Sequence, residues 1–212
     1  GIPIKREDFN KYGKEIEFFK GVTTWFERIN EFGKSLNIKI EHYIISSGQK
    51  EIIEGTTIIK YFKEIFASEF LYIDEKAVWP AMAVNYTTKT QFIARINKGV
   101  LDISDDSTLN RRMLAEDRRI SNKNMIYIGD GFTDIPSMRM THANGGYSIA
   151  VYQENNKEVA KTLLQDDRVD FATLADYSEN SDLERLIKKI IQTMAIGTEL
   201  YYEHKKQVQE NI

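Results

Sequence analysis

The sequence has 212 residues, of which 42% are hydrophobic and 29% charged, with 3 prolines and 12 glycines, and this composition excludes a disordered, collagen-like or low-complexity chain. Its formal net charge of -3 gives no general electrostatic reason to expect nucleic acid or an anionic membrane as a partner. Without cysteine there is no disulfide, no thiolate nucleophile and no cysteine-based metal site, as in proteins of a reducing compartment.

The sequence shows no pattern typical of membrane insertion or secretion. Every apolar run is shorter than the roughly 20 residues that a membrane-spanning helix needs, and the first residues, Gly-Ile-Pro, do not resemble a signal peptide. We therefore expect a cytoplasmic protein with neither a membrane nor a nucleic acid as its partner.

The N-terminal part of the sequence is predicted to form a helix, a strand and a second helix. Apolar residues recur at three- and four-residue steps over residues 15–32, which predicts an amphipathic helix that Gly33 ends. Residues 38–45 alternate and then become purely apolar, which predicts a strand entering a buried sheet. After residues 46–48, Ser-Ser-Gly, the spacing of apolar residues over 52–66 indicates the second helix.

The middle of the sequence is less regular. Residues 70–86 indicate strand or irregular structure that projects from the core, with a corner at Trp79-Pro80. A helix is predicted from Thr88-Lys89 to about residue 98, where Gly99 follows. Residues 101–123 are polar and give no clear assignment.

The C-terminal part alternates strands with helices. Strands are predicted over 125–128, 147–152 and 169–174, and helices from Asp134, over 157–164 and from Ser181. Ser181 and Glu184 form the pattern of a capping box at the start of the last helix. This alternation predicts an α/β protein with a Rossmann-like parallel sheet that has helices on both faces.

Two chemically distinctive segments follow predicted strands, at the carboxyl edge where such sheets bind ligands. In the second of them, Asp130 and Asp134 are four residues apart around a turn in which glycines flank Asp130. Two carboxylates that converge in this way are suitable ligands for Mg²⁺. The alternative interpretation is structural, with Asp130 in a turn and Asp134 as a helix N-cap.

The first segment and an isolated lysine suit an anion. Ser46, Ser47 and Gly48 are predicted to lie between a strand and a helix, where a hydroxyl and free N–H groups would bind phosphate oxygens. The alternative is an ordinary serine cap with a glycine turn. Lys89 opens a helix, where the macrodipole disfavours a cation unless an anion lies nearby; the alternative is a solvated surface lysine.

Taken together, these segments resemble the haloacid dehalogenase (HAD) superfamily of phosphohydrolases. The ordered set is IISSGQ, then the lysine of TTKTQF, then IYIGDGFTD, of which the GDGxTD element is the most specific. The later segments SIAVY and VDFATLADYSENSDLERLI are similar to the closing units of the same fold. The resemblance extends over about residues 38–195.

The resemblance implies a role for each matched residue. Ser46 would hydrogen-bond the transferring phosphoryl group, with help from the backbone around Ser47 and Gly48. Lys89 would neutralise the phosphate and the catalytic carboxylate. Asp130 would coordinate the cofactor, Mg²⁺, and Asp134 would ligate it or orient its water shell. These parts also meet the general needs of phosphoryl transfer, which are positioning and charge stabilisation.

The nucleophile of this superfamily is missing from the sequence. Its members attack phosphate with an aspartate of a DxDx(T/V) motif upstream of the serine motif. Before Ser46 the only aspartate is Asp8, in a polar segment, and Asp102, Asp105 and Asp106 have the wrong spacing and place in the order. We assign no nucleophile, since Ser46 has no evident activating base with which to replace it.

The missing motif would follow a strand between the strands that end at Ser46 and Asp130. Without it, two parallel strands would keep unpaired backbone groups at the buried centre of the sheet. We therefore expect the chain to be the C-terminal part of a longer protein, in which residues 1–33 are a remnant of a helical cap, residues 34–200 the core, and residues 201–212 a polar tail. Direct pairing of strands 38–45 and 125–128 would contradict this.

The sequence thus supports two hypotheses. The first is a Mg²⁺-dependent phosphatase acting on a small phosphorylated metabolite, and the second is a non-catalytic phosphate- and Mg²⁺-binding or regulatory protein of the same fold. Transfer of the phosphoryl group to an acceptor other than water is a further outcome of the first. Neither the substrate nor the oligomeric state follows from the sequence.

Overall fold

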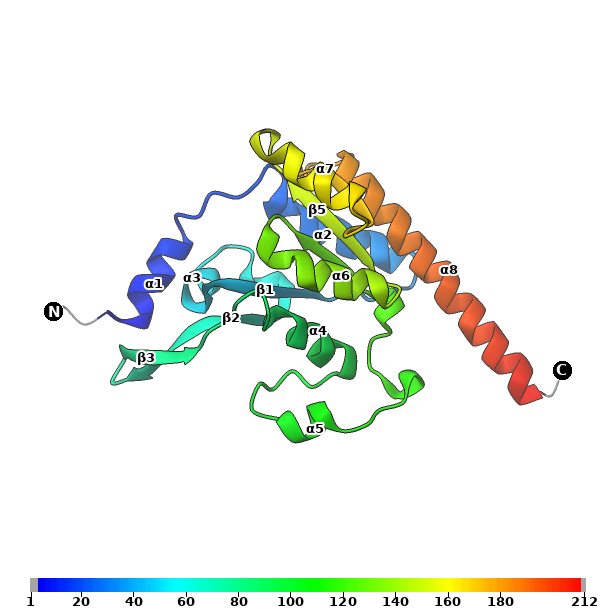
Figure 1. The fold of residues 1–212 in the computed structure, drawn as a ribbon, viewed down its shortest axis with the longest axis horizontal. Helices are drawn as coiled ribbons and strands as arrows, with labels where there is room; N and C mark the ends of the chain where they lie inside the picture. The colour runs from blue at the N-terminus through cyan, green and yellow to red at the C-terminus, as the bar shows by residue number, and fades with distance from the viewer. Residues whose placement is uncertain (1–3, 211–212) are drawn as a thin grey trace. The chain divides into compact units, whose positions relative to one another are not determined.

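The computed structural model of the protein describes residues 4–210, which Figure 1 draws as a ribbon. The chain divides into two units. The first unit consists of Gly1–Phe18 and Glu41–Ala172, and the second of Phe19–Ile40 and Thr173–Ile212. The boundaries expected after residues 33 and 200 both fall inside helices of the second unit. The structure is a mixed α/β protein, as expected, but its strands form two three-stranded sheets instead of one continuous sheet. No helix within residues 4–210 combines the length and apolarity required to span a bilayer.

The first sheet has the order β1-β2-β3, with β1 (His42–Gln49), β2 (Phe62–Ile73) and β3 (Lys76–Met82). Strand β1 is parallel to β2, and β2 is antiparallel to β3. The expected strand 38–45 therefore begins and ends later, and the Ser-Ser-Gly segment lies within it. The register passes from Ser46 opposite Ala67 to Gln49 opposite Ser68, so Ser47 and Gly48 leave the ladder as a bulge.

The prediction of a helix over residues 52–66 is wrong. Only α3 (Lys50–Glu54) and the 3₁₀ turn η1 (Ile59–Tyr61) are helical there, and Gly55 is the residue that follows α3. Phe62 and Phe66 belong to β2, where Phe66 is buried against Phe92 with ring centroids 4.6 Å apart. A short apolar run suits a buried strand as well as a helix, and the aromatic and β-branched residues favour the strand.

Strands β2 and β3 form a hairpin that continues beyond the last pair of β1 with β2 (Figure 1). Asp74 and Glu75 make its turn with positive φ angles. Trp79-Pro80 is not a corner but part of β3, an edge strand, where a proline removes no ladder hydrogen bond on the open side. Trp79 is 72% exposed, in agreement with a segment that projects from the core.

Helix α1 (Arg6–Gly13), which the sequence pattern did not predict, packs against α3 and the hairpin. The rings of Phe9 and Phe70 stack with centroids 5.6 Å apart. At the start of α1, Asp8 accepts a hydrogen bond from Lys5 N at 3.0 Å and so caps the helix.

The second sheet has the order β4-β5-β6, with β4 (Ile126–Gly129), β5 (Tyr147–Tyr152) and β6 (Phe171–Leu174). Strand β4 is parallel to β5. The associated helices are α6 (Ile135–Ala143) and α7 (Lys157–Gln165), with 3₁₀ turns η4 (Phe132–Asp134) and η5 (Glu154–Asn156) before them. These elements confirm the expected order of strands and helices. Their core consists of Met138, Ala150, Ala160, Leu163 and Val169.

Between the two sheets in sequence lies α4 (Lys89–Lys98), which begins where expected. Its Phe92 and Ile96 form a core with Phe66 and Val84. The polar segment after it contains α5 (Asp106–Asn110), η2 (Ala115–Asp117) and η3 (Asn122–Asn124). The buried Arg95 of α4 holds this segment by donating to the carbonyl oxygens of residues 102 and 103 at 2.7 and 3.0 Å.

The strands that carry the predicted site, β1 and β4, each lie at the edge of a different sheet. Ile44 and Ile45 of β1 and Ile126 and Ile128 of β4 are only partly buried, whereas the middle strands β2 and β5 contain fully buried residues. Among the described strands β1 and β4 do not pair, so the pairing that would contradict a missing central strand is not found. A single Rossmann-like sheet is not formed by these residues.

The second unit contains α2 (Val22–Ser35) and α8 (Asp182–Glu210). Helix α2 begins seven residues later than residue 15, after Gly21 with a φ of 85°, and Gly33 lies inside it. Arg28 of α2 donates to Glu184 of α8 at 2.8 and 3.0 Å. The N-cap of α8 is as expected, because Ser181 Oγ accepts a hydrogen bond from Glu184 N. The helix continues through the residues expected to form a polar tail.

The charged cluster that precedes β1 is expected to make the stability of the protein depend on pH. Burial opposes ionisation of Glu41, but hydrogen bonds from Arg119, Lys63 and Tyr43 outweigh burial and lower the pKa of Glu41 from 4.5 to about 2. Because the folded-state pKa is the lower one, this contribution is complete above pH 4.5 and disappears as the pH falls towards 2.

We expect Glu41→Gln to lower the free energy of unfolding by about 2 kcal/mol at neutral pH. Denaturation followed by circular dichroism across this pH range should show the difference from wild type shrinking as the pH falls. A difference that is constant with pH would show that the ionised carboxylate is not responsible.

Candidate functional site

Lys89 is a buried cation at the start of α4. The turn before the helix is fixed by Asn85, whose Oδ1 accepts hydrogen bonds from the N–H groups of Thr87 and Thr88 at 2.9 and 3.1 Å. Lys89 is only 5% exposed, so the interpretation as a solvated surface lysine is wrong. Because burial and the helix dipole both disfavour a cation at this position, a nearby negative charge is required.

Asp134 provides that charge. It follows β4, at the end of η4 and at the N-cap position of α6, and is 6% exposed. Its Oδ1 accepts a hydrogen bond from Lys89 Nζ at 2.7 Å, which joins two segments 45 residues apart in the sequence. Although Asp134 has the N-cap position, its side chain makes no capping hydrogen bond. The carboxylate is therefore used for the ion pair and not, as the structural alternative proposed, for the helix.

Tyr127 is a third member of this cluster that the sequence analysis missed. Its hydroxyl donates to the same Oδ1 of Asp134 at 2.7 Å. Burial and the charge of Asp134 raise the pKa of Tyr127 above its ordinary value, so the hydroxyl keeps its proton and remains a donor. The available signal was strand alternation, because Tyr127 and Gly129 are two residues apart and share one face of β4.

Gly129 makes room for the carboxylate. A Cβ atom at this position would lie 2.7 Å from Asp134 Cβ and 2.8 Å from its Cγ, and also 2.7 Å from the methyl carbon of Met138. All three distances are much shorter than a van der Waals contact. The glycine before Asp130 is therefore needed for the approach of Asp134 to the strand.

Asp130 is placed differently from Asp134. It is exposed in the turn after β4, and its charge contributes to the raised pKa of Tyr127, after burial and the larger effect of Asp134. Within the described part of the chain, Asp130 forms no hydrogen bond or ion pair with Lys89.

The serine segment is not the helix N-terminus that we expected. Ser46, Ser47 and Gly48 belong to β1, and α3 has only five residues and begins at Lys50. The expectation failed because two extra residues bulge from the strand before the turn. Ser46 Oγ accepts a hydrogen bond from Gly48 N at 3.0 Å, and within residues 4–210 it makes no hydrogen bond to Lys89, Asp130 or Asp134.

A relay of hydrogen bonds connects this segment with the start of α4. Ser68 Oγ of β2 donates to Ser47 O at 3.2 Å and accepts from Val84 N at 3.0 Å. Val84 lies five residues before Lys89. The bulge of β1 therefore lies near the segment that leads into α4, although the structure does not bring Ser46 itself to the ion pair.

Asp130 and Asp134 place two carboxylates in the segment that follows β4. Within residues 4–210 no three His, Asp or Glu side chains are grouped so that they alone hold a metal. Mg²⁺ is commonly bound by one or two carboxylates, with water and phosphate oxygens as the other ligands. Because Asp134 Oδ1 already accepts two hydrogen bonds, Oδ2 is the oxygen that this aspartate can offer. The oxygen donors of Asp130 and Asp134 are of the chemical kind that Mg²⁺ prefers.

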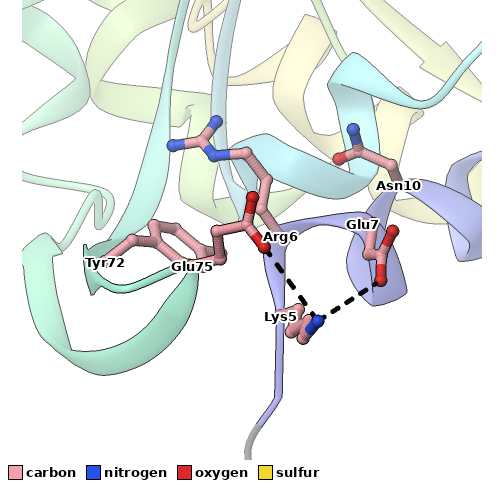
Figure 2. Close-up of a pocket in the computed structure, with 6 residues that line it drawn as sticks. All are labelled: Lys5, Arg6, Glu7, Asn10, Tyr72 and Glu75. Carbon is pink, nitrogen blue, oxygen red and sulfur yellow. Dashed lines mark ion pairs between the residues drawn. The ribbon is translucent and has the colours of Figure 1, made fainter.

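A surface cavity of about 400 Å³ lies elsewhere in the first unit (Figure 2). It is lined by Lys5, Arg6, Glu7, Asn10, Tyr72 and Glu75. Figure 2 shows Lys5 between Glu7 and Glu75, and both ion pairs are 4.0 Å long. Arg6 lies over the ring of Tyr72 at 4.7 Å. Its cations are thus already paired, and the cavity contains none of the residues expected to act on phosphate.

Comparison with known proteins finds a relative of unknown function. The chain is 32% identical over 203 residues to an uncharacterized protein of Borreliella burgdorferi, and the match covers 84% of this chain and 68% of the relative. The chain therefore belongs to the same family as that protein. No family model and no solved structure matches the chain.

We expect Gly129→Ala to disrupt the cluster, because the new methyl group cannot fit without displacing Asp134. The free energy of unfolding should fall by about 1–3 kcal/mol, the usual effect of overpacking. Thermal denaturation measures this directly. Gly131→Ala is the matched control, since a Cβ there would meet no atom nearer than 4.0 Å and φ is -141°. Equal stability of the two variants would contradict the close approach of Asp134 to β4.

Proposed function

We propose that the protein is a Mg²⁺-dependent phosphohydrolase of the HAD superfamily that acts on a small phosphorylated metabolite in the cytoplasm, with no nucleic acid or membrane as its partner. The observation that carries this proposal is the buried ion pair between Lys89 and Asp134. It unites the lysine of the second quoted motif with the last aspartate of the GDGFTD motif, the two residues that the resemblance assigns to phosphate and metal.

The ion pair supports a binding role because a buried ion pair contributes little net stability to a protein. Two charges removed from water lose several kcal/mol of hydration each, and replacing such a pair by apolar residues is often neutral or stabilising. Lys89 also stands against the helix dipole. A pair retained in spite of these costs suits a ligand that interacts with both charges.

The residues of this chain would divide the work of phosphoryl transfer. Lys89 would bind and neutralise the phosphoryl oxygens, and the hydroxyl of Ser46 would donate a hydrogen bond to one of them. Asp130 and Asp134 would hold Mg²⁺, which when bound stabilises negative charge on the phosphate. Tyr127 would hold the carboxylate of Asp134 in position through a hydrogen bond from its uncharged hydroxyl. The phosphoryl group would pass to a carboxylate and then to water or another acceptor.

The attacking carboxylate is not assigned to a residue of this sequence, because no DxDx(T/V) motif is present. That observation favours a second candidate, a non-catalytic protein that binds phosphate and Mg²⁺ with the same residues. The two candidates differ in turnover and share the binding site. In the catalytic case, the segment with the nucleophile would lie between the open edges of β1 and β4.

The test is Mg²⁺-dependent hydrolysis of p-nitrophenyl phosphate, measured with the 212-residue chain and with a longer form that carries the proposed nucleophile segment. We expect activity of the longer form that EDTA removes and that Lys89→Met or Asp130→Asn lowers by at least roughly 100-fold. Lys161→Met on the exposed face of α7 is the control and should retain full activity. The 212-residue chain should be inactive.

Hydrolysis that survives Lys89→Met would contradict the catalytic proposal, as would turnover by the 212-residue chain. Binding of phosphate and Mg²⁺ without turnover by either form would favour the second candidate. If neither ligand binds, both candidates are wrong.

A further inference from the structure

Lys89 depends on a single counter-charge. Within residues 4–210 the ammonium group has one polar partner, Asp134 Oδ1 at 2.7 Å, and the side chain is 6% exposed. A buried ammonium group without an anion is strongly disfavoured. Whatever draws Asp134 away from Lys89 must therefore be accompanied by another anion close to the lysine.

Asp134, in contrast, has two donors of different kinds. The charged donor is Lys89 and the neutral donor is Tyr127, and both donate a hydrogen bond to Oδ1 of Asp134. Among the described residues, none donates to Oδ2. If Lys89 turned to another anion, the hydroxyl of Tyr127 would still hold the carboxylate in its present position. The arrangement thus allows the lysine to leave while the aspartate stays.

From this geometry we infer that Lys89 couples the two ligands of the site, so that a divalent cation and a phosphate group bind with positive cooperativity. The inference rests on the proposed function, since it takes phosphate and Mg²⁺ as the ligands. A cation at Asp134 competes with Lys89 for the same carboxylate and releases the lysine towards phosphate. In the same way, phosphate draws Lys89 from Asp134 and leaves more negative charge for the cation. Tyr127 is the positioning residue that keeps Asp134 in place during this exchange.

Thermodynamic linkage makes the inference quantitative. If phosphate raises the affinity for Mg²⁺ by some factor, Mg²⁺ must raise the affinity for phosphate by the same factor. Coupling between two sites is commonly 5- to 150-fold, and we expect about tenfold for a single shared side chain. Direct attraction between Mg²⁺ and phosphate also contributes, so the share that belongs to Lys89 must be measured separately.

The experiment is calorimetric titration of the 212-residue chain with Mg²⁺ alone, with inorganic phosphate alone, and with each in the presence of the other. Blank titrations correct for complex formation between the two ions in solution. For the wild-type chain we expect reciprocal increases in affinity of about tenfold. In Lys89→Met, Mg²⁺ should bind at least as tightly as in wild type without phosphate, because its competitor is removed, and added phosphate should raise its affinity by clearly less.

Two further variants separate coupling from folding. Tyr127→Phe keeps the ion pair and removes one donor, so we expect weaker Mg²⁺ binding, by roughly tenfold as for other outer-shell partners of a metal ligand. Lys161→Met, an exposed lysine on α7, should behave as wild type. Circular dichroism of each variant shows whether it folds, and the wild-type titrations test the coupling even if Lys89→Met does not fold.

The outcomes separate this inference from the proposed function. If wild type binds both ions with independent affinities, or if each ion excludes the other, the coupling is wrong while the site remains. Equal cooperativity in wild type and Lys89→Met would show that the lysine does not carry it. If wild type binds neither ion, the proposed function fails and the inference fails with it.

Discussion

The buried ion pair between Lys89 and Asp134 is the interaction around which the candidate site is arranged. It connects the start of α4, which packs on the first sheet, with the turn after β4 of the second sheet. These two sheets share no strand pair among the described residues, and the ion pair joins elements that belong to each. Both charges are almost completely buried, and the surroundings are arranged for them: Gly129 leaves space and Tyr127 gives a neutral hydrogen bond.

Some parts of the candidate site could be predicted from the sequence and others could not. The order of strands and helices predicted the GDGFTD turn at a carboxyl edge and Lys89 at the start of a helix, and Lys89 and Asp134 do come together. Tyr127 and Gly129 share one face of β4. Tyr127 was missed because its role depends on Asp134 folding back over that face, close to Gly129. The position of Ser46 was predicted as a helix start, but the bulge of β1 keeps its hydroxyl on Gly48 instead. A bulge of this kind leaves no periodic signal in a sequence.

The fold was predictable to a similar extent. Strand β5, helix α7 and the serine N-cap of α8 follow from alternation and capping residues, which are local signals. The helix expected over 52–66 was wrong because its apolar spacing is compatible with the strand that Phe62 and Phe66 enter, and packing against α4 decides between them. The division into two sheets was not a local property at all, since it depends on which strands are available to pair with β1 and β4.

The proposed function requires that phosphate and a divalent cation bind where Lys89, Tyr127, Asp130 and Asp134 lie. The most direct measurement is the change in backbone amide NMR signals of the isotope-labelled 212-residue chain on addition of inorganic phosphate and Mg²⁺. The largest changes should be at the start of α4 and in the turn after β4, with smaller ones in the bulge of β1. Changes concentrated around the cavity of Lys5 and Arg6, or none at saturating ligand, would contradict the claim.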